Sequence, residues 1–554
     1  MEPSNKPSTN PARPWLWLLL AVAVIWFSNI EYRHLIEPDE GRYAEIPREM
    51  AASGDWVTPR LNGLKYFEKP PLQYWATAIA YTLFGEHHWT SRLWTALTGF
   101  TGLLLVWFAG ARLFGRKAGR YAALLLGSSL LYALMGHFNT LDMGVTFFMS
   151  LGIISLLLAQ HQDTDVRARR NWMWLAWAAL ALAILSKGLM GLVLPGAALV
   201  IYSLLQRDFA IWKRMHWGSG LLLLLLITAP WFYLVIKANP EFFQKFFIYE
   251  HYTRFTTKEH GRYQPWYYFI HILLLGFLPW TIVMLDTLVR SWKNSSGAIK
   301  TFNPQRFLLA WVVFIYVFFS MSGSKLPSYL LPIFPALALL MGKQLAEMSE
   351  RRLFWLVVPA LPFAILGLTL APFTDKLGNT PLKVQLYGDY AVWLMAAALV
   401  FLLGVTAALF LLRRSCKPAA VLMLALGSLL AAQIGSSGYN TIAVQRSAYL
   451  LAGKLRPHVK ESMPIYSVGN YEQTLTFYLK RTFILVQYQD EMAFGIMQEP
   501  QRWIPDLTSF AKVWEAQPEA MAIMQPPMFP QLQQLGLPMK VIHEDIQNVV
   551  VIKP

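Results

Sequence analysis

The densest group of chemically capable side chains is the string Glu37-Pro38-Asp39-Glu40-Gly41-Arg42-Tyr43-Ala44-Glu45, which follows the first apolar segment. Asp39 and Arg42 are three residues apart, so they share one face if this string is helical. A carboxylate at a membrane edge is costly to desolvate, and such residues commonly serve a function. The alternative is a solvated loop in which Asp39 caps a helix. The residues alone leave both interpretations open.

Three more groups place charge beside apolar segments. In Tyr66-Phe67-Glu68-Lys69-Pro70-Pro71 the prolines suit the start of a helix, and Glu68 with Lys69 forms either a surface ion pair or a metal or phosphate contact. Asp142 opens an apolar segment, either as a helix cap or as a functional acid. The string Glu250-His251-Tyr252-Thr253-Arg254 combines residue types that hold a metal and a phosphate, but it also suits a juxtamembrane helix with interfacial aromatic residues.

The elements that must position these side chains are apolar. Only 14% of the 554 residues are charged, against about 25% in soluble domains. Runs of apolar residues recur up to Ser436, and about 20 such residues span a bilayer. We predict a polytopic α-helical membrane protein from segments near 15–29, 70–85, 90–114, 121–136, 143–160, 172–186, 189–206, 218–236, 266–286, 306–322, 329–346, 353–371, 390–412 and 419–436.

Segment 70–85 decides the predicted topology. It is short, begins with two prolines and is rich in aromatic residues, which suits a helix lying at the membrane interface. With thirteen spans remaining and the N-terminus in the cytoplasm, the arginines and lysines gather in the inside loops, whereas counting 70–85 as a span destroys that pattern. Two long outside loops follow, 30–89 and 237–265. Residues 437–554 are predicted to form a small α/β domain outside the cytoplasm, separate from a membrane domain at 1–436.

Two lysines break this positive-inside pattern. Lys187 and Lys325 stand at the outer ends of spans, on the same predicted side as Arg42, Lys69 and Arg254. Cations directed into one external cavity suit a phosphate, and a lipid phosphate is the natural ligand at that depth. The net charge of +16 follows from the inside loops and indicates membrane lipids rather than nucleic acid as partners.

The strings PDEGRYAEIPREMAASGDWVTP, YFEKPP, EHYTRF and SGSKLPSYLLP resemble the bacterial lipid A 4-amino-4-deoxy-L-arabinose transferases. These enzymes belong to the integral-membrane glycosyltransferases of the C-type fold, which are related to protein O-mannosyltransferases. The resemblance extends across all thirteen predicted spans. It implies an inner-membrane enzyme with its active site and C-terminal domain in the periplasm, an undecaprenyl phosphate-linked aminoarabinose as donor and a phosphate of lipid A as acceptor. The product would confer resistance to cationic peptides such as polymyxin.

The resemblance also implies roles for particular residues. Asp39 is the leading catalytic candidate, with Asp142 as a second carboxylate near the sugar, and direct displacement would invert the sugar carbon. The chemistry requires no cofactor, although a divalent Zn or Mg ion between Glu68 and His251 is a candidate. The carrier phosphate would be held by Arg42, Lys69 and Arg254, and the substrate pocket would be lined by Tyr43, Tyr66, Lys187, Lys325 and Tyr329.

Two other functions fit the same predicted topology. A different polyprenyl-phosphate-sugar transferase would pass its sugar to a protein or glycan. A lipid-linked sugar transporter or flippase would also bind an anionic lipid. However, the sequence has no obvious paired repeat and no Gly-broken helices at the bilayer middle, which many transporters show.

Overall fold

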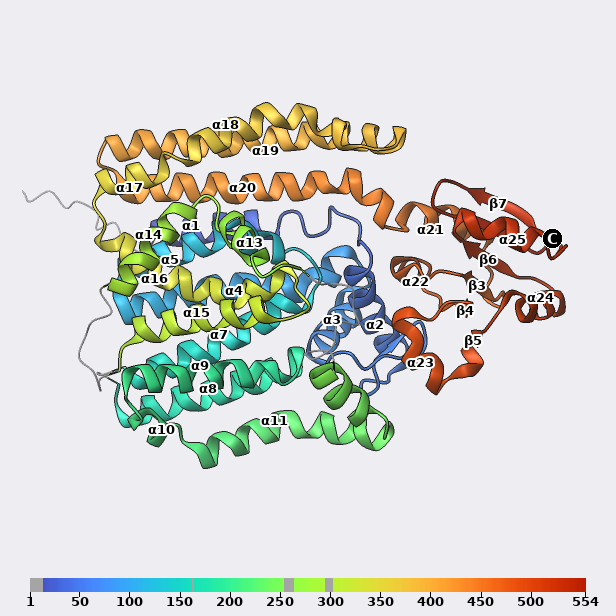
Figure 1. Cartoon of the computed structure of the whole chain (residues 1–554), viewed down its shortest axis with the longest axis horizontal. Coiled ribbons are helices and arrows are strands. Elements are labelled where there is room, and N and C mark those ends of the chain that lie inside the picture. The colour runs from blue at the N-terminus through green and yellow to red at the C-terminus, as the bar shows by residue number, and fades with distance from the viewer. Residues whose placement is uncertain (1–12, 162–163, 254–263, 294–301) are drawn as a thin grey trace, which may run out of the picture.

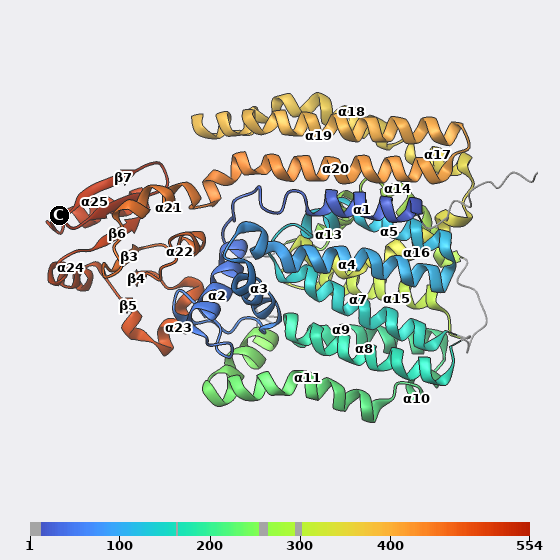
Figure 2. The same cartoon turned by 180° about the vertical axis from the view of Figure 1, so that it is seen from behind.

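Long apolar helices account for most of the chain, and they run side by side in a bundle (Figures 1 and 2). The computed structural model describes residues 13–161, 164–253, 264–293 and 302–554. Among these residues, eight helical stretches are long and apolar enough to cross a membrane. They are α4 (His88–Phe114), α7 (Leu141–Gln160), α11 (Trp217–Ala238), α15 (Pro304–Met321), a 3₁₀ turn (Pro327–Ile333) with α16 (Phe334–Glu347), α17 (Glu350–Val357) with α18 (Ala360–Leu370) and a 3₁₀ turn (Ala371–Leu377), α19 (Pro381–Arg413), and α20 (Lys417–Ala443).

The remaining predicted spans are shorter, less apolar or broken. They correspond to α1 (Arg13–Phe27), α5 (Arg116–Ser128) with α6 (Leu130–Met135), α8 (Val166–Lys187), α9 (Met190–Gln206), and α13 (Tyr268–Gly276) with α14 (Thr281–Lys293). The last pair was predicted as one segment, but α13 and α14 meet at 111°. Pro279 lies in the break and has no N–H to continue a helix. The chain is thus a multi-pass membrane protein, while the count of thirteen spans stays a prediction.

The outer face of the bundle suits lipid. On α11, Leu222, Leu225 and Leu226 are more than half exposed, as are Val392 and Leu403 on α19. Neighbouring leucines on one helix would form an unfavourable apolar patch in water. In a bilayer the same surface contacts the hydrocarbon chains of the lipids, which is favourable. The backbone polar groups of these stretches are bonded within the helices, as a membrane requires.

The first long loop, residues 30–89, folds into two helices and a hairpin. They are α2 (Asp39–Ser53), the strands β1 (Arg60–Leu61) and β2 (Leu64–Lys65), and α3 (Leu72–Phe84). With 13 residues and a rise of about 1.5 Å each, α3 is roughly 20 Å long, too short for a bilayer core of about 30 Å. Both helices lie at the end of the bundle that faces the C-terminal domain (Figure 1).

The C-terminal domain is built around a six-stranded sheet in the order β5-β4-β3-β6-β8-β7. Its strands are β3 (Ile465–Val468), β4 (Ile484–Val486), β5 (Trp503–Ile504), β6 (Met521–Met524), β7 (Lys540–Glu544) and β8 (Val549–Ile552). Its helices are α21 (Tyr449–Leu455), α22 (Gln473–Leu479), α23 (Ala493–Gln498), α24 (Leu507–Ala516) and α25 (Phe529–Gln533). Strand β3 runs parallel to β4 and β6, and β8 pairs antiparallel with β6 and β7. The α/β character predicted for residues 437–554 is confirmed by this sheet and these helices.

Helix α2 is pressed between the membrane helices and this domain. A Cβ placed on Gly41 would lie 2.7 Å from the backbone carbon of Gln473 on α22. Only glycine permits an approach this close. The glycine of the motif that begins at Pro38 therefore explains how α22 comes to lie directly on the helix that carries Asp39 and Arg42.

The buried side of α2 holds two carboxyl groups that share one arginine. Arg48 donates two hydrogen bonds to Glu45, at 2.6 and 2.7 Å. Glu49 Oε2 accepts the backbone N–H of Gly63, at 2.8 Å. Burial, followed by the negative charge of Glu45, raises the pKa of Glu49 from 4.5 to about 8. Glu49 therefore keeps its proton at neutral pH while Glu45 is paired with Arg48.

We expect this carboxyl to make the protein less stable in alkali. A carboxyl whose pKa is higher in the folded than in the unfolded chain stabilises the fold fully below pH 4.5, and this contribution is lost as the pH rises through 8. The melting temperature of the purified protein should fall between pH 5 and 8, and Glu49→Gln, which mimics the protonated form, should flatten the decline. Glu461→Gln, at an exposed position, is the control. A decline of equal slope in Glu49→Gln would contradict this assignment.

Candidate functional site

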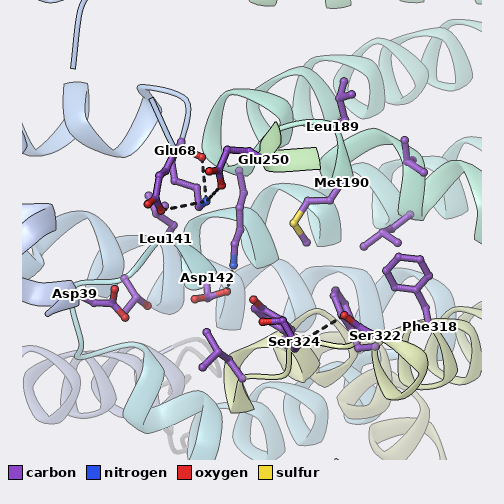
Figure 3. Close-up of a pocket in the computed structure, with 18 of the residues that line it drawn as sticks. Asp39, Glu68, Leu141, Asp142, Leu189, Met190, Glu250, Phe318, Ser322 and Ser324 are labelled. Atoms are coloured by element: carbon purple, nitrogen blue, oxygen red, sulfur yellow. Dashed lines mark hydrogen bonds and ion pairs between the residues drawn. The ribbon is translucent and has the colours of Figure 1, made fainter. Parts of the chain in front are cut away.

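A cavity of about 440 Å³ opens where α2, α7, α8, α9 and α15 meet. One part of its wall is charged and the other is apolar. Eight of the side chains singled out from the sequence line it: Asp39, Arg42, Tyr43, Glu68, Lys69, Asp142, Lys187 and Tyr329. They come from elements that are far apart in the sequence, and Figure 3 shows Asp39, Glu68 and Asp142 around one space.

Asp39 and Arg42 form the part of the wall that α2 contributes. Arg42 Nη1 lies 3.1 Å from Asp39 Oδ1, so the predicted helical face exists. The Arg42 side chain is 10% exposed, whereas that of Asp39 is 43% exposed and is thus the more accessible of the two. Arg42 also pairs with Glu491 of the C-terminal domain. Gln473 donates to Glu491 at 2.6 Å and fixes that carboxylate in turn.

Asp142 and Lys187 bring together the first turn of α7 and the last turn of α8. The two side chains form an ion pair (Figure 3). The ammonium of Lys187 also lies 5.2 Å from the ring centre of Tyr329, within the range of a cation–π contact. A lysine that broke the positive-inside pattern is therefore accounted for by a carboxylate and an aromatic ring at the same depth.

A third charged group surrounds Lys69. Its ammonium lies 4.0 Å from Glu68 Oε2 and 3.8 Å from Glu250 Oε2. Glu250 sits in a π-helical segment, Gln244–Thr253, and also lies 3.4 Å from Lys245. In Figure 3, Glu68 and Glu250 lie close together in this part of the wall.

Four predicted residues lie elsewhere or cannot be placed. Tyr66 is 3% exposed and stands behind Arg42, with its ring centre 5.8 Å from the guanidinium. Lys325 donates to the carbonyls of Ser322 and Gln264, at 2.6 and 2.9 Å, and is not among the described residues that line the cavity. Arg254 and the side chain of His251 lie outside the described residues. In the described part of the chain, no three His, Cys, Asp or Glu side chains cluster to hold a metal, so the metal pair of Glu68 and His251 stays a prediction.

The opposite wall of the cavity is apolar. It is formed by Leu189, Met190, Val193 and Leu194 at the start of α9, and by Phe318, Phe319 and Leu326 from α15 and the loop after it. Both helices belong to the membrane bundle, so this wall continues the hydrocarbon environment inward. Such a cavity accommodates a ligand with an anionic head and an apolar tail.

The charged wall holds three cations and four carboxylates. Arg42, Lys69 and Lys187 face Asp39, Glu68, Asp142 and Glu250. Each cation is already paired with a carboxylate, so an incoming phosphate must share these cations with the protein. Carboxylates that remain close to a bound phosphate would stabilise the cationic character of a neighbouring sugar.

A buried ion pair fixes the position of α2 relative to α4 and α7. Arg92 of α4 donates to both oxygens of Glu40, at 2.7 and 2.9 Å, and neither residue is more than 1% exposed. Glu40 Oε1 also accepts the N–H of Asn139, at 3.0 Å. Because Asn139 precedes α7, this one carboxylate ties the position of Asp39 to that of Asp142.

Sequence reasoning missed Glu491, which is 449 positions away from Arg42. It stands in a weakly patterned part of the C-terminal domain, and only the fold brings it to α2. Glu250 was named as part of a charged string but was not selected. Glu250 could have been found in the same way as Asp142, because each is an acidic residue beside an apolar segment.

Comparisons with known proteins find relatives for both parts of the chain. Residues 13–244 match the family model described as dolichyl-phosphate-mannose-protein mannosyltransferase, and residues 451–553 match the aminoarabinose transferase C-terminal domain. The undecaprenyl phosphate-α-4-amino-4-deoxy-L-arabinose arabinosyl transferase of Aeromonas salmonicida is 32% identical over 394 residues, 70% of each protein. The enzyme of that name, number 1, from Proteus mirabilis is 34% identical over 345 residues, which cover 61% of this chain and 60% of the relative.

A solved structure matches the whole fold. The crystal structure of ArnT from Cupriavidus metallidurans bound to undecaprenyl phosphate is 41% identical, covers 98% of both chains and superposes with a TM-score of 0.93. Its apo form superposes with a TM-score of 0.92. The similarity therefore includes the bundle, helices α2 and α3, and the C-terminal sheet together.

Proposed function

Since the chain belongs to the undecaprenyl phosphate-α-4-amino-4-deoxy-L-arabinose arabinosyl transferase family, we propose that it transfers 4-amino-4-deoxy-L-arabinose from undecaprenyl phosphate to a phosphate of lipid A. The observation that carries this proposal is the cavity whose charged wall meets an apolar wall inside the bundle. That arrangement fits a lipid phosphate that bears a sugar. Masking a lipid A phosphate would make the cell less sensitive to cationic peptides such as polymyxin.

The donor would bind with its prenyl chain along the apolar wall and its phosphate at Arg42 and Lys69, with Arg254 as a third candidate ligand. The sugar would then lie between Asp39 and Asp142. Tyr43 and Tyr329 line the same space, and Lys187 fixes Asp142. The geometry of the cavity and the family resemblance support these roles.

The reaction would be a direct displacement at the sugar carbon. An oxygen of the acceptor phosphate forms the new C–O bond while the bond to the carrier phosphate breaks, which leaves undecaprenyl phosphate and inverts the carbon. The acceptor phosphate is already an anion, so it needs little deprotonation, and Asp39 would stabilise the cationic character of the sugar and orient the acceptor. Arg42 and Lys69 would stabilise the charge that develops on the leaving phosphate.

The orientation follows from the positive-inside pattern. We place the cavity and the C-terminal domain on the periplasmic face of the inner membrane, with thirteen crossings in residues 1–436 and a separate domain at 437–554. Helix α20 continues past Ser436 to Ala443, so it carries the chain from the membrane toward the sheet.

The test is reconstitution. The purified full-length chain is supplied with synthetic undecaprenyl phosphate-aminoarabinose and lipid A, and the products are read by mass spectrometry and by the anomeric configuration of the sugar. Aminoarabinosyl-lipid A with inverted configuration supports the proposal. Transfer only to a protein or glycan acceptor would favour another polyprenyl-phosphate-sugar transferase. Movement of the donor across liposomes without transfer would favour a flippase.

Glu491 is expected to act on donor binding through Arg42. It pairs with the guanidinium and is 11% exposed. In Glu491→Ala, Arg42 loses the partner that fixes its second amino group, so the KM for the donor should rise about tenfold while kcat changes less, a loss of about 1.4 kcal/mol in binding. Steady-state kinetics of Asp490→Ala, an exposed neighbour, provide the control. An unchanged KM in Glu491→Ala would show that the C-terminal domain does not contribute to donor binding through Arg42.

A further inference from the structure

A second charged cavity lies at the end of the bundle opposite to Asp39. It measures about 450 Å³ and is formed by the beginnings of α5, α17 and α20 together with α1. Figure 1 shows α17 and the start of α20 at the end of the bundle away from α2 and α3. By the positive-inside pattern this end faces the cytoplasm.

The charges in this cavity are predominantly positive. Lys117, Arg120 and Lys417 line it together with one acid, Glu350. Lys417 is held in place because its ammonium donates to the carbonyls of Met348 and Leu345, at 2.6 and 3.1 Å. The bonded lysine remains a fixed positive charge at the wall, and Lys117 is exposed.

The charged cavity continues into an apolar groove. The groove, about 80 Å³ in volume, runs between α1, α4 and α5 and is lined by side chains such as Leu19, Leu104 and Trp107. Leu18, Arg120 and Leu124 line both spaces. A ligand whose head lies among the cations can therefore extend a chain along the lipid-facing groove without leaving the protein surface.

We propose that this pair of cavities is a binding site for an anionic phospholipid of the cytoplasmic leaflet. Its phosphate would lie between Lys117 and Arg120, and one acyl chain would follow the groove along α1. Basic pockets between membrane helices at the cytoplasmic side bind lipid head groups of this kind. A zwitterionic lipid fits less well, because its ammonium would meet three cations and only one carboxylate.

The site is tested by native mass spectrometry of the delipidated full-length protein in detergent. Undecaprenyl phosphate is added to fill the transfer cavity, and the protein is titrated with phosphatidylglycerol or with phosphatidylcholine of identical chains. We expect at least one phosphatidylglycerol to remain bound under conditions that remove phosphatidylcholine. Glycerol 1-phosphate in excess should not displace it, since the groove holds a chain. Equal retention of both lipids, or displacement by glycerol 1-phosphate, would overturn the proposal.

Variants locate the bound lipid. Each basic residue contributes about fivefold to binding at an anionic surface, so Lys117→Gln with Arg120→Gln should weaken phosphatidylglycerol binding about 25-fold. Ala123→Phe should weaken binding as well, because Ala123 lines the groove. Lys213→Gln removes one exposed charge from α10 (Ala210–Lys213) and should leave binding unchanged. If the double variant and Lys213→Gln bind equally, the lipid lies elsewhere and the proposal fails.

Discussion

Replacing Asp39 with asparagine is expected to lower kcat for sugar transfer by about 10²- to 10³-fold, the range associated with the loss of one group that stabilises developing charge in the transition state. Asp39 is the most exposed of the carboxylates whose ion pairs line the cavity, with 43% of its side chain accessible. It can therefore face a substrate, whereas Asp142 is 14% exposed and pairs with Lys187. Asparagine keeps the shape of the side chain and removes only its charge.

The measurement is transfer of aminoarabinose to lipid A under single-turnover conditions, with donor binding determined separately. Asp39 also accepts a bond from Arg42 at 3.1 Å, so a loss of donor affinity would indicate displacement of Arg42 rather than lost chemistry. Asp490→Asn removes an exposed charge from the neighbouring domain and should retain full turnover. If the turnover of Asp39→Asn stays within threefold of wild type, Asp39 is not the catalytic carboxylate and Asp142 becomes the leading candidate.

Much of this fold could be predicted because the signals are local. The apolar periodicity of the helices, the short strands of the C-terminal domain and the proline start of α3 are each visible within a few residues. The bend between α13 and α14 was not predicted, although Pro279 marks it, because the residues on both sides remain apolar.

The site could be predicted only in part, for a related reason. Asp39, Lys69 and Asp142 stand in charged strings beside apolar segments, and charge at a membrane edge is a strong local signal. The pairing of each cation was not visible. Arg42 meets Glu491 because α22 packs on Gly41, and Lys187 meets Asp142 because α7 and α8 are neighbours. Such contacts depend on tertiary packing and have no signature within either string.

The residue beside Asp39 is expected to matter more for folding than for chemistry. Glu40 and Arg92 form a bidentate pair with no more than 1% exposure, at the junction of α2 with α4. Burial alone would raise the pKa of Glu40, but Arg92 outweighs it and lowers the pKa to about 2. The carboxylate thus stabilises the fold above its unfolded pKa of 4.5, and this stabilisation is lost only as the pH falls toward 2.

Glu40→Ala should therefore destabilise the protein by about 3–5 kcal/mol, since it leaves a buried guanidinium without its counter-charge. Thermal unfolding in detergent measures this, with Glu31→Ala as the matched control. Glu31 also meets the start of α4, where it accepts the backbone N–H of Trp89 at 2.7 Å, but its side chain is 55% exposed and this helix-capping bond should be worth about 1 kcal/mol. A loss no larger than that of Glu31→Ala would refute the anchoring role of Glu40.

A second variant separates the ion pair from the other bonds that Arg92 makes. Arg92 also donates to the carbonyls of Ile30, Arg33 and His34, at 2.6 to 3.0 Å. Replacing a buried pair with apolar residues is often neutral, but here it would leave those carbonyls without their donor. Glu40→Leu with Arg92→Met should consequently recover only part of the stability lost in Glu40→Ala. Full recovery would show that the chain after α1 needs no bond from Arg92 to present Asp39.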